Sequence, residues 1–124
     1  MEGSILGLDF SKGLAFADRV FQSTGFSVHP MEDSDIFTMV VSFGRHYFCL
    51  NEDSVAAALE AAVGGSGIDL MVFLIKDKVF GFQVSCKVVA LFILTLRSFS
   101  CDQFKCYFHL WSNGGPNWNR EFKI

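Results

Sequence analysis

Phenylalanine is the residue that most constrains the fold of this chain, because it occupies fifteen of the 124 positions. Rings of this size are stable when buried, and apolar residues of all kinds make up 51% of the sequence against 19% that are charged. So much apolar surface offsets the entropy cost of ordering the chain, which excludes an intrinsically disordered protein. The length is that of one domain, and the phenylalanines supply it with a dense core.

An amphipathic helix is the clearest element in the sequence. Apolar residues recur at i, i+3, i+4, i+7 and i+8 from Val55 to Val63. Asn51 precedes them as a favourable N-cap, with two acidic residues after it, and Gly64-Gly65 is a favourable end. We therefore expect a helix between Asn51 and Gly64.

Strands are expected on both sides of this helix. Residues 36–43 are rich in β-branched and aromatic side chains, and residues 47–50 would continue them as a second short strand. Residues 104–111 alternate between apolar and polar side chains, which predicts a final strand.

A β-hairpin is expected where two apolar runs, residues 70–75 and 79–84, are separated by three polar residues. In the second run Phe80, Phe82 and Val84 share one face of the strand. We expect this face to point into the core, because the alternate residues would make a poor core.

Residues 86–98 fit a helix by their length, although their β-branched residues leave a strand as the alternative. In the helix, Leu91 and Leu94 fall beside Lys87 on the nominally polar side. Apolar side chains at such positions suggest a face that the N-terminal arm, a partner protein or a second copy covers. Leu91 and Leu94 are therefore the candidate protein-interaction residues.

The chain divides into three parts by composition. Residues 1–30 read as a separate N-terminal arm with a short helix near residues 12–21, residues 31–111 as an α+β domain, and residues 112–124 as an irregular tail. The apolar stripe expected on the arm's helix consists of Leu14, Ala17 and Phe21.

The expected element order β–α–β–β–α–β predicts a ferredoxin-like, RNA-recognition-like sandwich, with a four-stranded antiparallel sheet and two helices on one face. From about residue 31 to 111 the chain also resembles a plant domain of unknown function found in retroelement-derived proteins, where it often precedes a CCHC zinc knuckle. The resemblance implies an RNA-recognition-like fold and an origin in a nucleic-acid-handling element. The sequence contains no CCHC box. The resemblance therefore gives no support to nucleic-acid binding that depends on a zinc knuckle. The segments that carry the resemblance are DIFTMVVSF, NEDSVAAALEAAVGG, KDKVFGFQV and FKCYFHLW.

Nucleic-acid binding is the second hypothesis. The net charge is −3, but it divides into −6 over residues 1–85 and +3 over residues 86–124. Lys78, Phe80 and Phe82 partly match the third-strand motif of RNA-recognition domains, in which a lysine contacts phosphate and aromatic rings stack on bases. An inward orientation of both rings is the stronger interpretation.

A second aromatic and basic cluster stands near the C-terminus. It consists of Trp118, Arg120 and Lys123, beside His109 and Trp111. Such a cluster can bind single-stranded nucleic acid or a protein. The competing interpretation, which we prefer, is that Trp118 covers a sheet edge.

Catalysis, metals and cofactors have little support in this sequence. The three histidines are dispersed and no P-loop, G-x-S-x-G or H-E-x-x-H motif is present. Cys101, Cys106 and His109 do not have the spacing of a zinc finger or knuckle. We expect a protein that is not an enzyme, with no metal and no cofactor.

The compartment is expected to be intracellular, in the cytoplasm or nucleus, because the first residues lack a secretory signal. The four cysteines are then expected to be free thiols. The strongest apolar stretch, residues 88–96, is too short for a membrane span.

The leading functional hypothesis is a non-enzymatic protein–protein interaction domain of retroelement-like origin. Its partner would be an unidentified protein or a second copy. The first alternative is binding of single-stranded RNA or DNA through the sheet and the basic tail. The second is a small toxin or antidote of a selfish genetic element that acts on a host protein.

Overall fold

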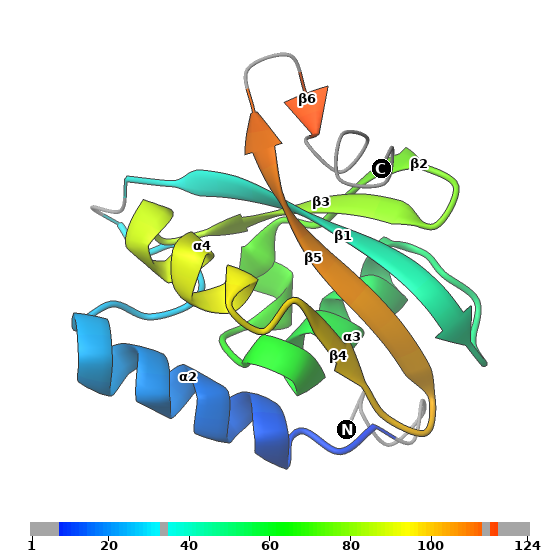
Figure 1. Ribbon diagram of the computed structural model, residues 1–124, viewed down its shortest axis with the longest axis horizontal. Helices are drawn as coiled ribbons and strands as arrows, with labels where there is room; N and C mark the ends of the chain where they lie inside the picture. The colour runs from blue at the N-terminus through cyan, green and yellow to red at the C-terminus, as the bar shows by residue number, and fades with distance from the viewer. Residues whose placement is uncertain (1–7, 33–34, 113–114, 117–124) are drawn as a thin grey trace.

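The described part of the computed structural model comprises residues 8–32, 35–112 and 115–116. Its strands form one antiparallel sheet, and its helices gather on one side of that sheet (Figure 1). The elements are α2 (Ser11–Thr24), β1 (Phe37–His46), α3 (Glu52–Val63), the 3₁₀ helix η1 (Gly67–Leu70), β2 (Phe73–Lys76), β3 (Val79–Val84), α4 (Lys87–Leu94), β4 (Ser98–Ser100), β5 (Phe104–Ser112) and β6 (Gly115–Pro116).

The sheet runs in the order β2-β3-β1-β5-β4, and β6 pairs with β5. This confirms the α+β class. The expectation of four strands and two helices is wrong for the described residues, because β4 adds a fifth strand beside β5 and α2 adds a third helix.

The inner face of the sheet is apolar and fully buried. Met39 of β1 lies opposite Phe82, and Val41 lies between Phe80 and Phe108 on the two neighbouring strands. All five side chains belong to the core cluster that the helices cover. The inward orientation predicted for Phe80 and Phe82 is confirmed.

The outer face of the sheet is covered in part by two aromatic rings that reach across it. Phe73 lies over Gly81, where a Cβ would overlap its ring, so only glycine leaves room for this crossing. The Phe73 ring meets Trp111 edge-on at 6.1 Å between centroids. Val40 of β1, which lies between β3 and β5, is completely buried.

Helix α3 begins and ends where the sequence predicts. The Asn51 side chain accepts a hydrogen bond from the Ser54 amide at 2.8 Å, and the Ser54 hydroxyl accepts one from the Asn51 amide at 3.0 Å. Gly64 ends the helix with a φ of 77°, a backbone conformation that favours glycine. This reciprocal cap satisfies backbone donors that would otherwise be unpaired.

Helix α2 packs against α3 and α4 instead of standing apart as an arm. Its buried residues are Gly13, Phe16 and Val20, whereas Leu14 and Phe21 of the predicted apolar stripe are exposed. The prediction was wrong for Leu14 and Phe21, whereas Ala17 is partly buried and packs against the core. It did not count Gly13 as a contact residue. Gly13 lies so close to α3 that a Cβ there would overlap the backbone oxygens of Glu60 and Ala61.

Two further expectations differ from the structure. Residues 47–50 form no strand, and the chain there leads directly to the cap of α3. The helix expected over residues 86–98 ends at Leu94, and a turn through Arg97, whose φ is 63°, leads into β4.

The C-terminal tail is only partly described. Ser112 belongs to β5 and pairs with Gly115 of β6, so the start of the expected irregular tail is a short hairpin. Residues 113–114 and 117–124 lie outside the described residues. Within the described ranges, no helix has the length and hydrophobicity that crossing a bilayer requires.

Candidate functional site

The candidate site is a groove between α4 and β5, which we call the α4–β5 groove. Its volume is about 540 Å³. The two elements that form its walls, α4 and β5, lie side by side in Figure 1. The residues that line it are Leu91, Leu94, Thr95, Arg97, Tyr107, Phe108 and His109.

The apolar wall of the groove comes from α4. This helix is only eight residues long, and it buries Val89, Ala90 and Ile93 against the sheet. Leu91, on another face of the helix, remains 44% exposed, and Leu94 is half-buried. Neither leucine packs against the main core in the described residues, and the structure brings both to the same groove.

The opposite wall is β5 where its pairing with β4 ends. Ser98 of β4 pairs with Tyr107, and the Phe108 amide donates a hydrogen bond of 3.0 Å to the Arg97 carbonyl oxygen. Phe108 itself is 3% exposed and points to the inner face. The turn before β4 therefore places an arginine at the rim of an apolar groove.

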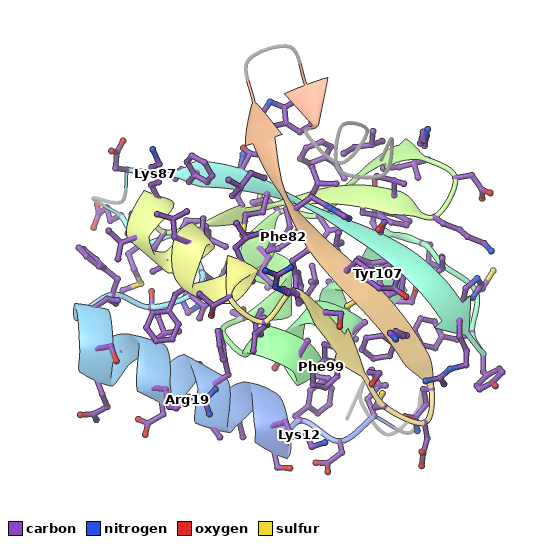
Figure 2. The ribbon with its side chains drawn as sticks, in the orientation of Figure 1. Lys12, Arg19, Phe82, Lys87, Phe99 and Tyr107 are labelled. Atoms are coloured by element: carbon purple, nitrogen blue, oxygen red, sulfur yellow. The ribbon has the colours of Figure 1, made fainter. Side chains whose placement is uncertain are left out.

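The charge of the groove is positive. Arg97 is exposed, and no carboxylate stands among the described residues that line the groove. The Lys105 amine lies 5.5 Å from the centre of the Tyr107 ring, so a second cation stands next to the groove. Lys87, in contrast, lies at the start of α4, away from Tyr107 (Figure 2).

His109 has a structural role in this wall. It is 2% exposed, and its Nε2 lies 2.9 Å from the Ser42 hydroxyl on the neighbouring strand. A buried imidazole that shares a hydrogen bond with a hydroxyl satisfies its polar atom without water. The pair fixes β5 against β1 beneath the groove.

The residues expected to contact nucleic acid are not brought to one surface. Phe80 and Phe82 are at most 2% exposed under the helices, so their rings are not available to stack on bases. Lys78 is exposed in the turn between β2 and β3, with a φ of 64°. Trp118, Arg120 and Lys123 lie outside the described residues.

The histidines and thiols do not converge on one site. Nδ1 of His29 accepts a hydrogen bond from the Ser66 amide, whereas Nδ1 of His46 lies 2.9 Å from the Phe48 carbonyl oxygen. Burial raises the pKa of the Cys106 thiol far above its ordinary value, which makes it a poor nucleophile. Among the residues that the structure describes, no three His, Cys, Asp or Glu side chains are grouped as a metal site.

Sequence reasoning identified Leu91 and Leu94 but missed Arg97 and Tyr107 as their neighbours. These two residues join the groove only because the chain turns back at Arg97 and forms β4. A non-glycine residue with positive φ has no strong sequence signal, so the turn was not predictable from composition.

Comparison with known proteins gives no relative for this chain: no protein-family model, no curated protein and no solved structure matches it.

Proposed function

We propose that this chain is a non-enzymatic protein-interaction domain, and that the α4–β5 groove binds an apolar segment of a protein. The observation that carries the proposal is the exposure of Leu91 beside Leu94 on the apolar wall of this groove. Apolar side chains that line a concave surface lose contact with water when a partner fills it.

The energy available from this surface is moderate. Full burial of a leucine contributes about 1.5–3 kcal/mol, so two partly exposed leucines contribute about 2 kcal/mol together. A free energy of this size changes a dissociation constant by more than tenfold. Removing the apolar wall is therefore expected to weaken a micromolar interaction by more than tenfold.

The charge of the groove indicates the chemistry of its occupant. Arg97 at the rim and Lys105 next to the groove favour a segment that carries carboxylates beside its apolar residues.

The test is selection of binders from a phage-displayed library of random peptides on the immobilised protein. We expect the selected peptides to be apolar and acidic, and to bind the Leu91→Glu/Leu94→Glu double variant at least about tenfold more weakly. The matched control is Leu14→Glu on α2, a leucine that is 65% exposed and lies outside the groove. It should bind the peptides as the unchanged protein does.

Two results would overturn the proposal. One is a library that yields no specific peptide. The other is a set of peptides that bind the double variant as well as they bind the control, provided that circular dichroism shows both variants folded.

The finer classification and origin also remain our proposal. The order β2-β3-β1-β5, with α3 and α4 as the connecting helices, supports a ferredoxin-like unit to which α2 and β4 have been added. The retroelement-like origin is supported by the resemblance of residues 31–111.

A further inference from the structure

A second exposed apolar feature stands on the 3₁₀ helix η1 and the residue after it. Ile68 is 82% exposed and Met71 is 60% exposed, and both border one hollow of about 440 Å³. We call the segment Ile68 to Met71 the η1 knob. It projects two apolar side chains from a short, fixed turn.

The η1 knob is held firmly at its base. Leu70 is completely buried between its exposed neighbours. Gly67 lies against α3, where a Cβ would come within 2.7 Å of the Ala56 carbonyl oxygen, and its amide donates to the Glu60 carboxylate at 3.3 Å. A pre-organised knob loses little conformational entropy when it docks.

The charge of the η1 knob is opposite to that of the groove. Asp69 is exposed on the knob itself, and Glu52 and Asp53 of α3 border the same hollow. At the groove the neighbouring charges are Arg97 and Lys105. Over the whole sequence the same division holds, with −6 in residues 1–85 and +3 in residues 86–124.

We propose that the occupant of the α4–β5 groove is the η1 knob of a second copy of this chain. The inference rests on the proposed function of the groove and adds the identity of its partner. Ile68 and Met71 would pack on Leu91 and Leu94, while the carboxylates of the knob approach Arg97 and Lys105.

The geometry makes this contact head-to-tail. The groove lies at β5, whereas η1 packs against β3, near the other edge of the sheet. The two surfaces are different, so each bound copy still offers a free groove or a free knob. Assembly is therefore open-ended, and it grows with protein concentration.

The test uses two variants that each destroy one surface, with sedimentation velocity as the measurement. Leu91→Glu removes the groove and keeps the knob, and Ile68→Glu removes the knob and keeps the groove. We expect the unchanged protein to form larger species as its concentration rises, and less so at high salt. Each variant alone should remain a monomer, and an equal mixture of the two should form a one-to-one dimer.

A second pair of variants is used in case Leu91→Glu or Ile68→Glu disturbs folding. Arg97→Glu and Asp69→Lys change exposed charges outside the core, and in their mixture both contacts between unlike variants join opposite charges. Each alone should assemble less than the unchanged protein, and the mixture should again form larger species as its concentration rises.

The inference is overturned if the unchanged protein stays monomeric at its highest soluble concentration, or if neither mixture associates. Assembly that persists in Ile68→Glu alone also contradicts it. A monomeric protein whose groove still selects peptides would refute the self-association and leave the proposed function standing. A protein that neither assembles nor selects peptides would refute both.

Discussion

Helices α3 and α4 lie on the same face of the sheet, yet they differ in how completely their apolar side chains are buried. Within the described residues, α3 leaves no large apolar side chain exposed, whereas α4 exposes Val88 and Leu91. Helix α3 is 12 residues long with a reciprocal cap, and α4 is eight residues long without a side-chain cap in the described chain.

The difference arises from the layer above the two helices. Gly13 lets α2 approach the backbone of α3 closely, so α3 is enclosed between α2 and the sheet. Phe16 of α2 meets Phe92 of α4 edge-on, with the ring centroids 5.8 Å apart. The C-terminal half of α4 thus leaves Leu91 exposed at the α4–β5 groove.

The largest effect should come from shortening a core leucine of α3. Leu59 is completely buried, so Leu59→Ala should lower the free energy of unfolding by about 2–5 kcal/mol. Leu91→Ala on α4, where the side chain is 44% exposed, should lower it by less than about 1 kcal/mol. Urea unfolding of the two variants measures the difference. Equal losses would show that α4 is as much a core helix as α3.

The next effect concerns the close approach of α2 and α3. In an isolated helix, Gly13→Ala would be stabilising by about 1 kcal/mol. Here the added methyl group would overlap backbone oxygens of α3, and we expect a loss of about 2 kcal/mol instead.

Gly44→Ala is the matched control for this variant, because its added methyl group would meet Tyr107 at an ordinary 3.5 Å. Thermal unfolding of both variants shows whether Gly13→Ala stabilises or destabilises the protein. A stabilised Gly13→Ala protein would mean that α2 does not enclose α3.

The smallest effect should distinguish the two helix starts. Asn51→Ala removes the side chain that accepts from the Ser54 amide, and it should cost about 1 kcal/mol. Cys86→Ala, at the corresponding position of α4, removes no capping bond in the described residues and should cost less. Chemical denaturation measures the free energy of unfolding of both variants. A larger loss for Cys86→Ala than for Asn51→Ala would contradict the assignment of the stabilising cap to α3.

Most local elements were predictable because their signals are local. The cap at Asn51, the period from Val55 to Val63 and the alternation around Phe82 each concern residues close in sequence, and the structure confirms all three. The resemblance and the prediction that the chain is not an enzyme stay predictions.

The remaining features depend on contacts between distant residues. Gly13 as a packing residue requires the position of α3, and the crossing of Phe73 over Gly81 requires the register of two strands. The turn at Arg97, which creates β4 and the rim of the groove, has a positive φ without a glycine. No periodicity in the sequence carries such information.

The most direct test of the account is an amide chemical-shift titration of isotope-labelled protein with the best peptide from the display selection. We predict that the shifted resonances belong to the C-terminal half of α4, the turn at Arg97, and residues 107–109 of β5. Shifts that instead cluster on α3 or on the outer face of the sheet would contradict the claim that α4 carries the binding surface.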